Sequence, residues 1–172
     1  MGRKHRRQSS FEDDVPNIGG YYLVLGQLRI QNLYKGATPT NPCGSGDVDL
    51  IEECFVIETQ QKHRFVTLQI LNQPICPILC ALVKEYVGGK FVGWKMVGSG
   101  GNTSSQYNFD IIRESRGKVR EIEYYFTDGY NNPGSPLFPN GLATTGYGTA
   151  KRIHKSEVPE LIKKYPGGAC TT

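Results

Sequence analysis

Short segments in which apolar and polar residues alternate, separated by glycine-rich turns, constrain the fold of this chain most strongly. In the segment 21–34, Leu28 and Ile30 alternate with glutamine and arginine, and in 63–71, Val66 alternates in the same way with its neighbours. A period of two over a segment bounded by turn residues predicts a half-buried β-strand. Further strands are expected at 48–59, 107–113 and 118–127.

Residues 75–87 fit two structures. Their apolar residues recur at the spacing of a helical stripe, and Gly88 could end such a helix. The same letters also fit a strand, because Gly88 and Gly89 form a two-residue hairpin signal between 82–87 and 90–97. Valine, tyrosine, phenylalanine and tryptophan favour sheet. We therefore expect the hairpin, with the helix left as the alternative.

The run 128–149 is predicted to be a long loop, because its 22 residues hold five glycines, three prolines and three asparagines. Loops of that length in compact domains are often functional. Amphipathic rings and amide side chains there could contact a ligand. The candidate ligand residues are Asp128, Tyr130, Asn131, Asn132 and Tyr147. After this loop, Ser156 is expected to cap a short helix at 157–165.

These elements predict a mainly β protein. Seven or eight short strands joined by glycine-rich turns are typical of an antiparallel β-sandwich or jelly roll, and a barrel is a further possibility. At 172 residues, the chain is expected to form a single β-rich domain over 19–172, with one short C-terminal helix. Residues 1–18 are expected to form a flexible arm that is first basic and then acidic.

The net charge of +4 lies in the first ten residues, where Arg3, Lys4, Arg6 and Arg7 stand without an acid. From residue 11 onward the remaining bases balance the 16 acids. A mobile basic arm of this kind can contact RNA or DNA, but four cations give only weak, salt-sensitive binding unless many copies act together. The C-terminal part of the chain carries a second candidate set of phosphate-binding residues, Lys151, Arg152 and Lys155.

Three functions are compatible with this layout. A short basic arm on an antiparallel sandwich resembles the layout of small icosahedral viral coat proteins, which implies a non-enzymatic, self-assembling structural protein that forms homo-oligomers and touches nucleic acid. Exposed sheet edges favour the same assembly. The alternative is a monomeric or dimeric binding module of effector, lectin or suppressor type that uses the 128–149 loop. A small ribonuclease-like enzyme is the third hypothesis.

A ribonuclease site would need a general acid and base, and His63 and His154 are the histidines outside the arm. Arg116 or Arg120 could hold phosphate, with Glu123 as a carboxylate. Nothing in the sequence places these residues together. We therefore expect no catalytic site, no enzyme activity and no cofactor.

The five cysteines form no CxxC pair, and no cluster of histidines lies near them at metal-ligand spacing. We therefore expect no metal site. Buried reduced thiols are the favoured interpretation, and a disulfide such as Cys43 to Cys54 is the alternative in an oxidising compartment. No apolar run reaches the roughly 18 residues of a membrane span, and no apolar segment follows the basic N-terminus. The expected location is intracellular or virion-like.

Overall fold

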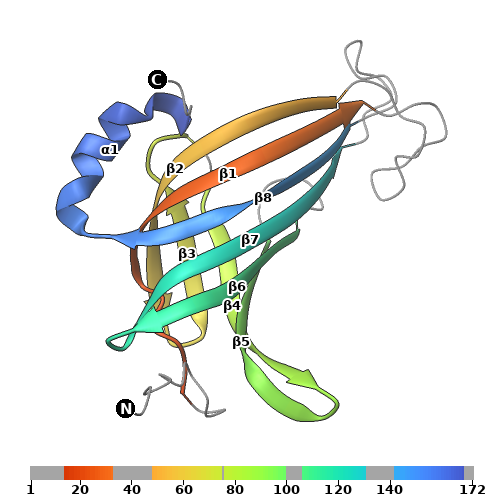
Figure 1. Ribbon diagram of the computed structural model, residues 1–172, viewed down its shortest axis with the longest axis vertical. Coiled ribbons are helices and arrows are strands. Elements are labelled where there is room, and N and C mark those ends of the chain that lie inside the picture. The colour runs from red at the N-terminus through yellow and green to blue at the C-terminus, as the bar shows by residue number, and fades with distance from the viewer. Residues whose placement is uncertain (1–13, 33–47, 75, 100–105, 131–141, 169–172) are drawn as a thin grey trace, which may run out of the picture.

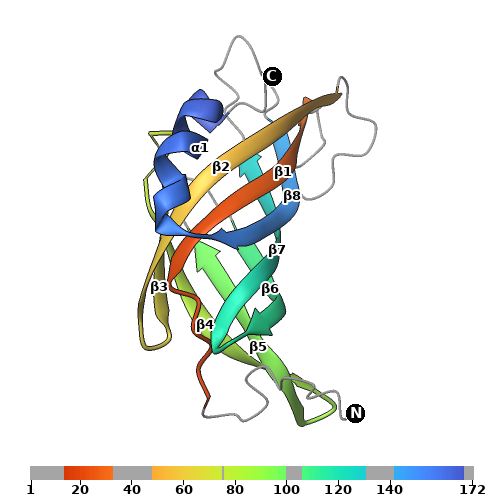
Figure 2. The same cartoon turned by 60° about the vertical axis from the view of Figure 1, so that its left-hand side comes forward.

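A computed structural model describes residues 14–32, 48–74, 76–99, 106–130 and 142–168. Its strands are β1 (Gly20–Asn32), β2 (Val48–Lys62), β3 (Phe65–Ile70), β4 (Ile78–Val87), β5 (Lys90–Ser99), β6 (Gln106–Ser115), β7 (Lys118–Tyr130) and β8 (Leu142–Ile153). Each strand pairs antiparallel with the next along the chain, and β8 returns to pair with β1. The strands therefore follow one another round a single closed sheet (Figures 1 and 2).

The mainly β architecture with antiparallel strands is confirmed, whereas the expected sandwich or jelly roll is not. The eight strands form one sheet rather than two facing sheets. The structure agrees better with the barrel alternative, although the extent of pairing differs between neighbouring strands. The strands β1, β2 and β8 pair along most of their length, but β3 pairs with β4 only from Phe65↔Ala81 to Leu68↔Ile78.

The hairpin expected in the ambiguous region is confirmed. Residues from Ile78 to Val87 form β4, and the turn at Gly88 and Gly89 leads directly into β5. Both glycines have positive φ, 58° and 79°, as a two-residue hairpin turn of this kind requires. The tip of the hairpin projects beyond the neighbouring strands (Figure 1).

The long loop expected at 128–149 is wrong in extent. Residues 128–130 end β7, and residues 142–149 belong to β8, so only 131–141 lie outside the described residues. The prediction treated Gly146 and Gly148 as turn residues, but both lie within β8. A Cβ at Gly148 would collide with the backbone of β1. Glycine inside a strand here marks a close approach rather than a turn.

The segment 14–19 packs at the end of the barrel where β1 begins. Ile18 is fully buried, and its N–H donates to Gln61 Oε1 at 2.8 Å. Gln61 Nε2 donates to Pro16 O at 2.7 Å, and Val119 N–H donates to Asn17 O at 2.8 Å. These bonds satisfy buried backbone groups that no strand partner reaches.

Arg152, near the end of β8, forms several hydrogen bonds at this end of the barrel, which the segment 14–19 covers and which we call the closed end. Its Nε donates to Val119 O at 2.6 Å and its Nη1 to Gly19 O at 2.8 Å. Its Nη2 donates to Tyr22 Oη at 2.9 Å, and the guanidinium carbon lies 5.0 Å from the centroid of the Tyr22 ring. Tyr22 is itself fully buried and donates to Ile18 O at 2.7 Å. Burial lowers the pKa of Arg152 and raises that of Tyr22.

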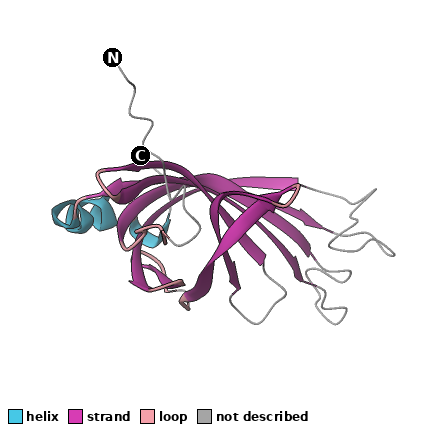
Figure 3. Ribbon diagram, turned by 90° about the horizontal axis from the view of Figure 1, so that it is seen from below, coloured by secondary structure: helices cyan, strands magenta, loops and turns pink. Residues whose placement is uncertain are grey.

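The C-terminal helical segment consists of η1 (Lys155–Glu157), α1 (Val158–Lys164) and η2 (Pro166–Gly168). The short helix is confirmed, but His154 rather than Ser156 is its first cap, because the His154 side chain accepts from the backbone of Ser156 while Glu157 accepts from His154 N–H. Asn72 Nδ2 donates to Tyr165 O at 2.8 Å. The larger helical segment lies to one side of the barrel (Figure 3), whereas Gly168 of η2 is buried, and a Cβ there would collide with the Phe55 ring. None of the helices in the described residues is long and apolar enough to cross a membrane.

We predict that Arg152→Met lowers the free energy of unfolding by about 2 kcal/mol or more, because it leaves partly buried carbonyl oxygens without their charged donor. Denaturant unfolding monitored by Trp94 fluorescence measures this. The control is Lys151→Met on the same strand, where the exposed side chain predicts a change within about 0.5 kcal/mol. Equal effects of the two substitutions would contradict the anchoring role of Arg152.

Candidate functional site

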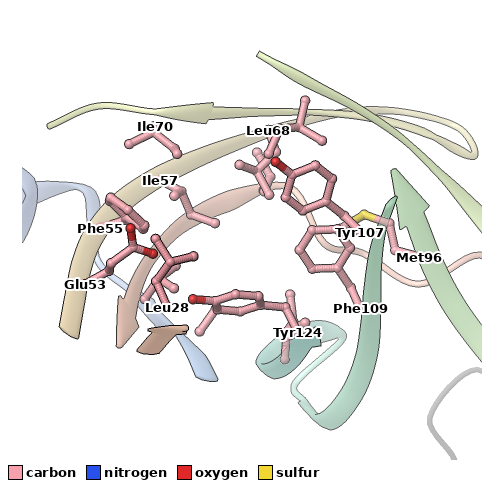
Figure 4. A pocket seen from close by; sticks show the side chains of 15 residues that line it. Leu28, Glu53, Phe55, Ile57, Leu68, Ile70, Met96, Tyr107, Phe109 and Tyr124 are labelled. Atoms are coloured by element: carbon pink, nitrogen blue, oxygen red, sulfur yellow. The ribbon is translucent and has the colours of Figure 1, made fainter. Parts of the chain in front are cut away.

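The barrel contains a partly open cavity of about 230 Å³, and all eight strands contribute to its wall. The lining residues occupy inward-facing positions that alternate along each strand. They are Val24, Leu28, Glu53, Phe55, Ile57, Thr59, Leu68, Ile70, Ile78, Met96, Tyr107, Phe109, Ile122, Tyr124 and Ala150 (Figure 4).

The wall of this cavity is predominantly apolar and aromatic. The rings of Tyr107 and Phe109 are stacked with centroids 6.3 Å apart, and Phe109 lies 6.4 Å from Tyr124. Thr59 is polar, but its hydroxyl already donates a hydrogen bond to Ile18 O at 2.7 Å, at the closed end of the barrel. The cavity is therefore an apolar space with few polar groups.

Four residues that are paired across neighbouring strands form a row on the inner face of the sheet, and Glu53 lies at one end of this row. Tyr124 on β7 pairs with Gly148 on β8, Gly148 pairs with Gly26 on β1, and Gly26 pairs with Glu53 on β2. A Cβ at Gly26 would collide with Tyr124 Oη, and a Cβ at Gly148 would lie 2.7 Å from Tyr124 Cε1. The two glycines thus form a floor on which the Tyr124 ring lies. Its hydroxyl points toward the side of the cavity that holds Glu53 (Figure 4).

Burial changes the acidity of both polar groups in this row. Removal from water raises the pKa of Glu53, because the charged carboxylate loses hydration. Burial also raises the pKa of Tyr124, and the nearby Glu53 charge raises it further. Tyr124 is therefore a neutral phenol at physiological pH, and Glu53 accepts a proton more readily than an exposed glutamate.

A second hollow, of about 620 Å³, lies along β1, β2, β7 and β8, and Glu53 and Tyr124 border it as well as the cavity. Gln27, Glu123 and Tyr147 belong to the outer face, because they alternate with the cavity residues along their strands. Tyr147 Oη donates to Gln27 Oε1 at 2.6 Å, and Tyr147 is 56% exposed. This hollow is more polar than the internal cavity.

The ligand residues predicted from the 128–149 run are not brought together in the described structure. Tyr147 stands on the outer face of β8. Asp128 and Tyr130 belong to the last residues of β7, and their side chains are not described. Asn131 and Asn132 lie outside the described residues, as do the arm residues Arg3, Lys4, Arg6 and Arg7.

The basic residues at the end of β8 divide into two groups. Lys151 and Lys155 are exposed. Arg152, the third residue of this predicted phosphate-binding set, differs from the two lysines, because its guanidinium donates to the carbonyls of Val119 and Gly19 and to Tyr22. It is a structural residue of the closed end and not a free surface cation.

The histidines do not form a catalytic pair in the described residues. His63 occupies the turn between β2 and β3 with φ 60°. His154 caps the C-terminal helical segment, with Nδ1 2.7 Å from Ser156 Oγ. No hydrogen bond or ion pair joins the two in the part of the chain that the structure describes.

The cysteines differ from one another. Cys54 is disulfide-bonded, which departs from the favoured expectation of reduced thiols, and its partner lies outside the described residues. Cys76 and Cys80 are free, and burial raises the pKa of the Cys80 thiol to about 12. Within the described ranges no group of three or more His, Cys, Asp or Glu is placed to hold a metal ion.

Comparison with known proteins gives no identification: no protein-family model and no curated protein sequence matches this chain.

We predict that Gly148→Ala destabilises the protein by about 2 kcal/mol or more, since the added Cβ meets the backbone of β1 and the Tyr124 ring. Thermal and urea unfolding measure the change. Gly19→Ala is the matched control, because its Cβ would meet nothing closer than 3.7 Å, and its expected cost is below about 1 kcal/mol. A tolerated Gly148→Ala would contradict the close-packed glycine floor.

Proposed function

We propose that this protein is a binding protein that holds one small, largely apolar molecule inside its barrel. The observation that carries the proposal is the partly open cavity of about 230 Å³ that is lined by inward-facing side chains of all eight strands. Protein interiors are close-packed, with few voids larger than a water molecule. Antiparallel barrels of eight strands are wide enough either to be filled by side chains or to hold one small ligand.

The volume of the cavity indicates how large a part of the ligand can be buried. An engineered apolar cavity of about 150 Å³ in another protein accommodates benzene. The larger space here is suited to a molecule of roughly ten non-hydrogen atoms. Its wall of aliphatic and aromatic side chains favours a compact ligand with an apolar body, since burial of that body is the main source of affinity.

This proposal keeps the binding-module hypothesis and moves its site. The expected ligand loop is replaced by the barrel interior, because most of the run 128–149 that is described belongs to β7 and β8. Tyr147, offered as a loop contact, faces the outside. The residues proposed to contact ligand instead include Phe55, Met96 and Tyr124.

The self-assembling, coat-like hypothesis stays a prediction. Its argument from open sheet edges does not apply to the described strands, because β1 pairs with β8. Assembly through other surfaces, with the arm contacting nucleic acid, predicts oligomers in light scattering and loss of RNA retention when residues 1–10 are deleted. A monomer under all conditions would contradict it.

The disulfide at Cys54 bears on the cellular compartment. Disulfides persist in oxidising environments and are rare in the cytosol. We infer that the protein functions in an oxidising compartment rather than at the intracellular location expected from the sequence.

The central test fills the cavity. Ala150 lines the cavity and is 3% exposed, so Ala150→Leu places three extra carbon atoms in the space proposed for the ligand. We expect stability within about 1 kcal/mol of wild type, because an existing void takes up the added volume. Binding of n-propylbenzene should weaken at least about tenfold.

The binding measurement follows the methyl resonance of Met96, a cavity residue and one of two methionines in the chain. Lys151→Leu places the same leucine side chain on the exposed outer face of the same strand and should leave binding unchanged. If Ala150→Leu binds n-propylbenzene as wild type does, the ligand does not occupy this cavity.

A further inference from the structure

We infer that the ligand of this cavity carries a positively charged amine, which pairs with Glu53 while the apolar remainder of the molecule fills the barrel. This inference rests on the proposed function, because it specifies the chemical class of the molecule bound at the same site.

Glu53 is the acidic residue among those that line the cavity. It lies on β2, two residues before Phe55, at a position where side chains face inward. The described residues provide it with no hydrogen bond and no basic side chain in an ion pair. Glu52, its neighbour in sequence, belongs to the opposite face and is exposed.

A carboxylate beside an apolar cavity is costly unless a partner replaces the water that it loses. A neutral apolar ligand would remove more water from Glu53 and offer nothing in return. An anionic ligand would add repulsion. A protonated amine supplies both the opposite charge and N–H donors, and such charge-assisted hydrogen bonds are the strongest that a side chain makes.

The surroundings of Glu53 suit an ammonium group as well. Tyr124 lies across the floor formed by Gly26 and Gly148, and its hydroxyl points to the side of the cavity where Glu53 stands (Figure 4). As a neutral phenol, Tyr124 can accept a hydrogen bond from an ammonium through its oxygen. The aromatic ring of Phe55 also lies on this side, and ring faces attract cations.

The remaining wall sets the shape of the molecule. Leu68, Met96 and Phe109 line parts of the cavity away from Glu53 (Figure 4) and offer only apolar surface. With space for roughly ten non-hydrogen atoms, the inferred class is a small arylalkylamine, in which a short chain joins one aromatic ring to the amine.

The test compares 2-phenylethylamine with n-propylbenzene, which has the same number of non-hydrogen atoms but no charge. Glu53→Gln keeps the size and removes the charge of the side chain. We expect the variant to bind 2-phenylethylamine about tenfold or more weakly and n-propylbenzene within about twofold of wild type. Titrations are followed by calorimetry and by the Met96 methyl resonance, which also reports that the variant is folded.

Glu52→Gln is the matched control, because it removes a carboxylate from the adjacent position on the outer face. It should leave both affinities unchanged. An equal loss of amine binding in Glu52→Gln and Glu53→Gln would show that the amine responds to the general surface charge, and would overturn the inference.

The pH dependence gives a second readout. Since burial raises the pKa of Glu53, its carboxylate is protonated at a higher pH than an ordinary glutamate, and amine affinity should fall as the pH is lowered through that value. Tyr107 and Tyr124 are the phenols among the other residues that line the cavity, and Glu52 and Glu123 are the carboxylates that border the second hollow together with Glu53. Glu53→Gln should abolish this fall.

The outcomes separate the two proposals. If wild type binds n-propylbenzene but Glu53→Gln does not weaken the amine, or if 3-phenylpropanoate binds more tightly than 2-phenylethylamine, the amine inference is wrong and the cavity proposal stands. If neither 2-phenylethylamine nor n-propylbenzene shifts the Met96 resonance, both proposals fail.

Discussion

The pairing of β1 with β8 is the constraint on which the rest of the structure depends. It closes the sheet, and closure creates an interior that inward-facing side chains from every strand can share. Two sets of residues support the pairing of β1 with β8. Gly26 and Gly148 meet there and leave room for the Tyr124 ring, while Arg152 ties the end of β8 to the segment before β1. A side chain at Gly148 would collide with the backbone of β1, so this glycine is needed for the two strands to approach so closely.

The same closure gives the interior its chemical character. Apolar side chains form most of the wall. At the closed end, Arg152 donates hydrogen bonds to Tyr22 and to the carbonyl of Val119. Glu53 is different, because it faces the cavity without a basic partner among the described residues. A charge in that position is either a cost to stability or a means of recognising a cation. We favour recognition, since the groups around Glu53 can also contact an amine.

Part of this structure was predictable from the sequence. Alternation, together with the glycine hairpin signal, identified seven strands, and the alternation around Val66 agrees with the burial of that residue, because a period of two determines which side chains share a face. The eighth strand was missed, since the composition around Gly146 and Gly148 is that of a loop, and the need for Gly148 comes from its spatial neighbours, the backbone of β1 and the Tyr124 ring. The strand order, and hence the cavity, was beyond reach because pairing between β1 and β8 joins distant parts of the chain. Glu53 was overlooked because a glutamate next to Glu52 has the pattern of a solvated surface.

A structure of the protein in complex with 2-phenylethylamine tests most directly whether the barrel binds an amine through Glu53. We predict that the amine nitrogen lies at hydrogen-bond distance, about 3 Å, from a carboxylate oxygen of Glu53. The phenyl ring should lie inside the barrel against Met96 and Phe109. An amine bound only on the outer face, with the cavity collapsed or filled by rearranged side chains, would contradict binding inside the barrel.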